Sequence, residues 1–171
     1  MKNVEIRNFR DSDTKSLFRF RSQIGTETDF VSFKNDSLEN LRVNQSYFSE
    51  PTGGHFLALI DGRVIGLVYF STNYQTKAST IETIGVLKEA RGMGVGKKLL
   101  EKVFYYLVQK GFNKVSLEVD KENTTAISFY KSLGFTKLSE TKTDIKLSLS
   151  LSETKASSFS FRKESRGYHN W

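Results

Sequence analysis

The fold is indicated most strongly by one stretch, Val86-Leu87-Lys88-Glu89-Ala90-Arg91-Gly92-Met93-Gly94-Val95-Gly96-Lys97-Lys98. Its three glycines lie at alternate positions, where an apolar segment that we expect to be a strand gives way to a helix. The first turn of a helix has free backbone N–H groups and the positive end of the helix dipole. Glycines let an anion approach those groups without obstruction by a Cβ atom. The stretch therefore predicts a binding site for a diphosphate, to which Arg91, Lys97 and Lys98 add positive charge.

Apolar periodicity predicts an alternation of strands and helices on both sides of this stretch. Upstream we expect a strand at Val4–Phe9, a helix from Asp11 or Asp13 to about Gly25, a second helix after Asp36, a hairpin of Phe56–Ile60 and Arg63–Ser71 turning at Asp61-Gly62, and a strand at Thr80–Leu87. Downstream we expect a helix from Val95 to Val108, a strand at Lys114–Val119, a short helix between Asn123 and Gly134, and strands at Phe135–Ser139 and Ile145–Leu151.

This order predicts a mixed α/β (α+β) domain, in which the only clear parallel crossover is the β–α–β unit around the glycines. Residues 1–151 are expected to form one domain. Residues 152–171 form a tail rich in serine that also contains Phe159, Phe161, Tyr168 and Trp171. We leave open whether this tail is disordered or docks on something.

Composition limits the classes of function. The chain has no cysteine, which excludes disulfides, thiolate metal sites and a cysteine nucleophile, and no metal site is expected. No apolar run is long enough to cross a bilayer, and the charged N-terminus does not resemble a secretory signal, so we expect a cytoplasmic protein without a membrane partner. The net charge of +7 favours an anionic partner, but the basic residues are scattered, so nucleic acid is not expected.

Three phosphate-binding patterns compete for the glycine stretch. A P-loop would need glycine at Arg91 and serine or threonine at Lys98. The Rossmann fingerprint would need its third glycine at Lys97. Arg91-Gly92-Met93-Gly94-Val95-Gly96 instead matches Gln/Arg-x-x-Gly-x-Gly/Ala, the diphosphate loop of the GNAT superfamily. The later segment Leu117–Phe135, with Asn123, Ala126, Phe129-Tyr130 and Gly134-Phe135, resembles the second hallmark of that superfamily.

This resemblance covers roughly residues 1–151 and implies an acetyl-CoA-dependent N-acetyltransferase. Its implied fold is a mixed, mostly antiparallel sheet that splays between the fourth and fifth strands, where the pantetheine arm inserts. The implied acetyl-CoA-binding residues are Ile84 and Val86 on the cofactor-facing strand, Arg91, Gly92, Met93, Gly94, Val95, Gly96 and Lys97 in the diphosphate loop, and Asn123 beside the cofactor arm.

The resemblance also implies catalytic roles. Tyr130 corresponds to the general acid that protonates the leaving thiolate. Many relatives have a glutamate as base where this chain has Thr80. Glu82 lies two residues later, on the same face if the strand alternates regularly. We therefore expect Glu82 to act as the base, with a chain of water molecules as the alternative and a bulge in the strand as the feature that would disturb the alternation.

The acceptor is expected to be a primary amine of a small molecule or of a protein. Glu27 and Asp29 lie where the superfamily forms the acceptor lip, and their charge suits a cationic amine. Because Thr80 replaces the usual base, a catalytically silent acyl-CoA-binding or regulatory module remains the alternative function. The sequence leaves a homodimer open.

Overall fold

The computed structural model describes residues 3–27 and 53–151 of the chain. The helix expected after Asp36, the acceptor candidate Asp29 and the tail from Ser152 lie outside the described residues. The described strands form one seven-stranded sheet with the order β1-β2-β3-β4-β5-β7-β6. Their bounds are β1 Glu5–Arg7, β2 Gly53–Ile60, β3 Arg63–Asn73, β4 Ala78–Val86, β5 Lys114–Asp120, β6 Thr136–Glu140 and β7 Asp144–Ser150.

Helices pack on both faces of this sheet. Leu17, Phe20 and Ile24 of α1 are buried with apolar residues of β2 and β3 on one face. On the other face, α4 and α5 contribute to the larger core around Phe70, Ile81 and Leu117. The helical segments are η1 Asp11–Asp13, α1 Thr14–Glu27, η3 Lys88–Ala90, α4 Val95–Gln109 and α5 Thr124–Ser132, where η marks a 3-10 turn. The sheet is therefore shielded by helices on both sides, as a mixed α/β domain requires.

The strongest local signals in the sequence are confirmed. Asp61 and Gly62 have φ angles of 51° and 76°, the left-handed values that a tight primed turn needs between β2 and β3. The apolar stripe of α4 is buried as far as Leu107, with Leu99, Leu100 and Val103 at 0% exposure, and Val108 at its end is partly buried. Gly134 ends the segment after α5 with a φ angle of 92°.

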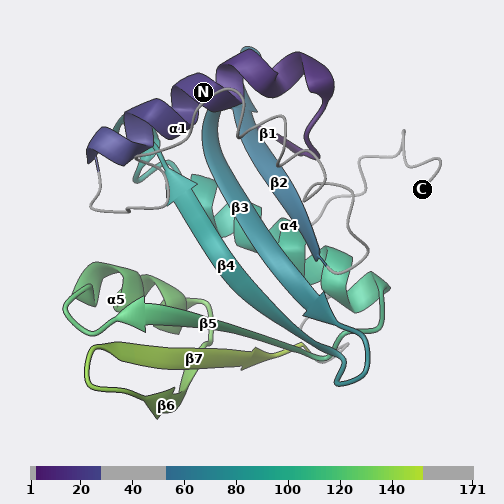
Figure 1. Cartoon of the computed structure of the whole chain (residues 1–171), viewed down its shortest axis with the longest axis vertical. Coiled ribbons are helices and arrows are strands. Elements are labelled where there is room, and N and C mark those ends of the chain that lie inside the picture. The colour runs from purple at the N-terminus through teal and green to yellow at the C-terminus, as the bar shows by residue number, and fades with distance from the viewer. Residues whose placement is uncertain (1–2, 28–52, 152–171) are drawn as a thin grey trace.

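The pairing of β4 with β5 is short, and this opens the sheet. The two strands run parallel but are paired only between Ala78–Ile81 and Lys114–Leu117. Beyond this point β4 stays with β3 as far as Val86, while β5 stays with β7 as far as Asp120. Figure 1 shows the carboxyl ends of the two strands diverging, with α5 beside the end of β5. The expected splay between the fourth and fifth strands is confirmed.

A β-bulge interrupts β4 at Glu82. Tyr69 of β3 is paired with Thr83 and Phe70 with Ile81, so Glu82 has no residue opposite it. Regular alternation, on which the choice of Glu82 depended, therefore fails at this residue. The Glu82 side chain is exposed and accepts a 2.5 Å hydrogen bond from the Ser71 hydroxyl. Since Ser71 is paired with Thr80, this hydrogen bond keeps the Glu82 carboxylate close to Thr80.

Candidate active site

The glycine stretch forms an open, uncapped helix start. Gly92 and Gly94 have φ angles of 78° and 75°, and a Cβ atom built on either would have nothing within 4 Å. Gly94 is the N-cap of α4 and therefore has no side chain to cap the helix. The bond from the Lys98 amide to the Gly94 carbonyl, 3.0 Å long, is the first that closes a helical turn. The amides of Val95, Gly96 and Lys97 precede this bond and suit an anion.

Arg91 lies between the end of β4 and the end of α1. Its Nε donates a 3.0 Å hydrogen bond to the Val86 carbonyl, and its Nη2 lies 3.6 Å from Oε2 of Glu27. The guanidinium group is 46% exposed, so part of it faces solvent. Arg91 therefore connects the last residue of β4 with α1, beside the helix start.

The residues expected to contact the cofactor arm line the opened part of the sheet. Ile84 and Val86 are half-buried and pack against the core shared with α4 and α5. A Cβ atom on Gly96 would lie 3.4 Å from the ring of Phe129, so the start of α4 and the middle of α5 are close together. Phe129, which the sequence analysis treated only as part of the second hallmark, therefore forms one wall of this region.

Asn123 and Tyr130 come from the segment that follows β5. The Asn123 side chain accepts a 3.0 Å hydrogen bond from the Ala126 amide and so caps α5, which confirms the expected cap. Tyr130 is 8% exposed and packs against the rings of Phe129 and Phe135. Burial raises the pKa of the Tyr130 phenol to about 12, so the phenol keeps its proton at neutral pH.

The predicted site residues are only partly joined by contacts. Arg91, Val86 and Glu27 are linked as described, and Lys97 forms a 3.9 Å ion pair with Glu101. Within residues 3–27 and 53–151, no hydrogen bond joins Glu82 to Tyr130: Glu82 is exposed and bonded to Ser71, whereas Tyr130 belongs to the core that α4 and α5 share. The site roles of these residues, and of the exposed Met93, remain predictions.

One polar residue near the site, Ser71, was missed by the sequence analysis, and another polar residue, His55, is buried in β2. Ser71 donates to Glu82, and its place opposite Thr80 depends on the register between β3 and β4, which the residues of β4 alone do not give. His55 is 8% exposed and paired with Tyr69 in the sheet. Burial lowers the pKa of His55 to about 4, which keeps the imidazole neutral at neutral pH.

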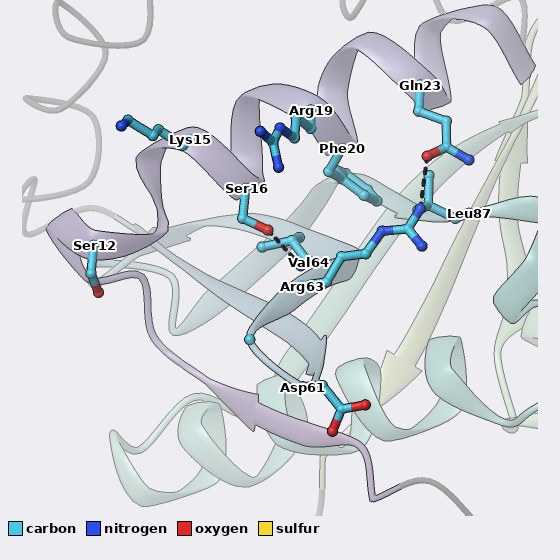
Figure 2. A pocket seen from close by; sticks show the side chains of 11 residues that line it. Ser12, Lys15, Ser16, Arg19, Phe20, Gln23, Asp61, Arg63, Val64 and Leu87 are labelled. Atoms are coloured by element: carbon cyan, nitrogen blue, oxygen red, sulfur yellow. Dashed lines mark hydrogen bonds between the residues drawn. The ribbon is translucent and has the colours of Figure 1, made fainter.

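A pocket of about 410 Å³ lies elsewhere, between α1 and the β2–β3 turn. Figure 2 shows its walls, with Arg63 reaching up to Gln23 and the Val64 amide held by Ser16. It contains none of the predicted site residues. Its lining residues are Ser12, Lys15, Ser16, Arg19, Phe20, Gln23, Asp61, Gly62, Arg63, Val64 and Leu87.

Comparison with known proteins agrees with this geometry. The profile of the Acetyltransferase (GNAT) family matches residues 19–135, which include the glycine stretch and Tyr130. The chain belongs to this family. Among curated relatives, the mycothiol acetyltransferase of Streptomyces griseus is 34% identical over 83 residues, which cover 48% of this chain and 27% of that protein. The GNAT chain thus spans only about a quarter of the length of that relative.

Solved structures share the fold of this GNAT chain at low sequence identity. A GNAT acetyltransferase of Streptococcus pneumoniae has a TM-score of 0.74 and 19% identity, with 86% of this chain and 99% of that chain covered. The PaiA N-acetyltransferase of Thermoplasma acidophilum, solved in complex with coenzyme A, has a TM-score of 0.71 at the same identity and coverage. Both likenesses establish the architecture of the domain.

None of the helices within residues 3–27 and 53–151 is long and apolar enough to cross a bilayer. In the same part of the chain, no three side chains of His, Asp or Glu come together as a group that could hold a metal ion. The cytoplasmic location remains a prediction.

Proposed function

We propose that this chain transfers the acetyl group of acetyl-CoA to an amine. The observation that carries the proposal is the uncapped start of α4, with Gly92 and Gly94 open to solvent, beside the gap between β4 and β5. Membership of the GNAT family supports the reaction, and the coenzyme A complex of the PaiA enzyme, which has the same fold, supports the donor.

The residues present suit such a donor. The amides of Val95, Gly96 and Lys97 would hold the diphosphate, with the Lys97 ammonium nearby. The unpaired edge of β4 at Ile84 and Val86 offers backbone groups to the pantetheine arm, in the manner of an added strand. The side-chain oxygen of Asn123 caps α5, and its NH₂ group is left to contact the pantetheine arm near the carboxyl end of β5. Acetyl-CoA supplies the acetyl group as a thioester.

Acetyl transfer needs one proton removed from the amine and one given to sulfur. The new nitrogen–carbon bond forms as the carbon–sulfur bond breaks. A lysine-like amine has a pKa near 10.4, so its deprotonation at neutral pH costs roughly 4–5 kcal/mol. Glu82 is exposed and held by Ser71, and it accepts this proton directly or through water. Tyr130 keeps its proton and stabilises the leaving thiolate through a hydrogen bond, and the released thiolate takes its proton from water.

The acceptor is a primary amine of a small molecule or of a protein. The acidic side chain of Glu82 beside the opening favours a cationic acceptor over an anionic one. The name mycothiol acetyltransferase describes those longer proteins, of which this chain covers about a quarter, and it does not identify the acceptor of this chain.

An acetylation assay with a panel of amines tests the proposal. Purified protein, acetyl-CoA and each amine are incubated, free thiol release is followed, and the product mass is measured. We expect at least one amine to gain a single acetyl group with release of one thiol. Coenzyme A binding without turnover on polyamines, amino acids, aminoglycosides and peptides would instead indicate a binding module.

A further inference from the structure

Glu27, the last residue of α1, makes contacts that do not suit an acceptor-binding role. Its Oε2 accepts a 2.7 Å hydrogen bond from the Lys88 amide, and its Oε1 accepts a 2.9 Å hydrogen bond from Nε2 of Gln23. Arg91 lies 3.6 Å away, and the Glu27 side chain is only 15% exposed. The carboxylate therefore faces the segment Lys88–Arg91 and is largely occupied. Figure 1 shows the corresponding end of α1 beside the carboxyl end of β4.

The position of this carboxylate is costly for α1 itself. The last turn of a helix carries the negative end of the helix dipole, where an acidic side chain is disfavoured. Burial also opposes the charge of Glu27, but hydrogen bonds from the Lys88 amide and Gln23, together with the charge of Arg91, outweigh it and hold the Glu27 pKa below its usual value. Glu27 is therefore ionised at neutral pH, and two of its three partners, Lys88 and Arg91, lie outside α1.

Those partners belong to the segment that shapes the helix start. Lys88 begins η3, and Arg91 ends it and binds the Val86 carbonyl. Only Gly92, Met93 and Gly94 separate Arg91 from α4. With Lys88 and Arg91 tied to Glu27, both ends of the 3-10 turn are held against α1, and the short glycine connection has a fixed starting point.

We propose that Glu27 is a positioning residue for the acetyl-CoA loop, whose carboxylate fastens the segment Lys88–Arg91 to the end of α1 and so holds the first amides of α4 ready for the diphosphate. The expected effect on the KM for acetyl-CoA rests on the proposed function, whereas the contacts of Glu27 with Lys88 and Arg91 do not depend on it. The positioning role replaces the acceptor-binding role expected for Glu27.

The test compares Glu27→Ala with Glu27→Gln and with Glu89→Ala as matched control. Glu89 lies in η3, the 3-10 turn that begins at Lys88. Its side chain is 52% exposed, and its carboxylate pairs with Arg63. Glu27→Ala and Glu89→Ala remove the same charge near the diphosphate site, and electrostatics alone would strengthen anion binding in both. If positioning matters, Glu27→Ala raises the KM for acetyl-CoA about tenfold. The KM for the amine and kcat stay nearly constant.

The conservative variant separates the hydrogen bond from the charge. Glu27→Gln keeps an oxygen that accepts from the Lys88 amide, so we expect most of the affinity for acetyl-CoA to be retained. Glu89→Ala should leave that affinity unchanged or slightly increased. Hydrogen exchange at the Lys88 amide gives a readout that needs no turnover: it should accelerate in Glu27→Ala and stay slow in the other two variants.

Three results would overturn the proposal. One is a Glu27→Ala protein with unchanged Lys88 exchange and unchanged affinity for acetyl-CoA. Another is an increase in the KM for the amine with no change in the KM for acetyl-CoA, which would instead support the acceptor-binding role expected for Glu27. The third is tighter coenzyme A binding. If Glu27→Ala does not fold, Glu27→Asp keeps the charge but is one methylene shorter, and normal Lys88 exchange in that variant would equally overturn it. If no amine is acetylated, exchange and coenzyme A titration still decide the role of Glu27.

Discussion

At the scale of single residues, the buried phenol of Tyr130 limits how a proton can reach sulfur. Its pKa is about 12, whereas an ordinary thiol has a pKa near 8.5. Complete transfer of the proton would therefore cost roughly 5 kcal/mol, at about 1.4 kcal/mol for each pKa unit. Tyr130 is thus better suited to donate a hydrogen bond to the developing thiolate than to give up its proton early in the reaction.

Replacing this phenol tests that role. Tyr130→Phe keeps the ring contacts with Phe129 and Phe135 but removes the donor. We expect kcat to fall by roughly 10–10²-fold, because a hydrogen bond to a charged group contributes about 1.5–3 kcal/mol, with little change in the KM for acetyl-CoA. Steady-state kinetics measures both. Tyr74→Phe, at a site that is 47% exposed, is the control. Equal activity of Tyr130→Phe and the parent protein would remove Tyr130 from the mechanism.

The burial of His55 has a consequence for stability rather than for catalysis. Its folded-state pKa of about 4 lies below the ordinary value of 6.5, so the unfolded chain binds the proton first as the pH falls. The stability associated with neutral His55 is complete above pH 6.5 and is lost as the pH falls towards 4. The loss approaches roughly 3 kcal/mol, from about 1.4 kcal/mol for each pKa unit.

Urea unfolding of the parent protein and of His55→Gln at several pH values measures this effect. At pH 8 His55 is neutral in both the folded and the unfolded chain. The difference in unfolding free energy between the two proteins at that pH therefore measures the effects of the substitution other than titration. We expect the parent protein to lose more stability than His55→Gln between pH 6.5 and 4. Parallel profiles over this range would show that His55 titrates normally in the folded state.

At the scale of elements, a buried ion pair joins β1 to η1, the 3-10 turn that leads directly into α1. Both oxygens of Asp13 accept from Arg7, at 2.6 and 2.8 Å, and the Arg10 amide donates to Oδ2 at 2.8 Å. The Asp13 side chain is 6% exposed, and the hydrogen bond from Arg7 lowers its pKa although burial opposes the charge. Glu5 adds a second, weaker contact to Arg7 at 3.2 Å.

Removing one partner of this pair leaves the other charge buried. Asp13→Ala should lower the free energy of unfolding by roughly 3–5 kcal/mol, because Arg7 then lacks its bidentate partner. Asp11→Ala, at an exposed position of the same 3-10 turn, is the control and should cost far less. Chemical denaturation gives both values. A loss for Asp13→Ala no greater than that for Asp11→Ala would show that the pair does not anchor α1.

Individual elements were well predicted where a short-range signal exists. Asp61-Gly62 predicted the hairpin, the stripe through Leu99 and Val103 predicted α4, and Asn123 predicted the start of α5. The bulge at Glu82 was not predictable, because it depends on the register between β3 and β4 and not on the residues of β4 alone. For the same reason, the Lys88 amide could not be foreseen as the partner of Glu27, since the two residues are far apart in sequence.

At the scale of the whole molecule, the sheet order determines where the opening lies. β7 is inserted between β5 and β6, so β5 is paired along its length on one side and only briefly with β4 on the other. The apolar periodicity predicted these strands but not their order in the sheet. The alternation within a strand shows which residues are buried, and it does not show which strand lies beside it. The resemblance, not the spacing, implied the splay, and the short β4–β5 ladder confirms it.

The central claim is that the bare amides at the start of α4 bind the diphosphate of coenzyme A. Two glycines of the same helix region allow a matched test, because Gly94 at its start and Gly111 beyond its end have φ angles of 75° and 76° and nothing within 4 Å of a built Cβ atom. Alanine strains the backbone similarly at both positions, by roughly 1–2 kcal/mol.

The most direct measurement is calorimetric titration of coenzyme A into the parent protein, Gly94→Ala and Gly111→Ala. The account predicts that Gly94→Ala weakens binding by about tenfold or more, equivalent to about 1.4 kcal/mol, while Gly111→Ala binds like the parent protein. Equal affinities for the two variants, or no binding by the parent protein, would contradict it.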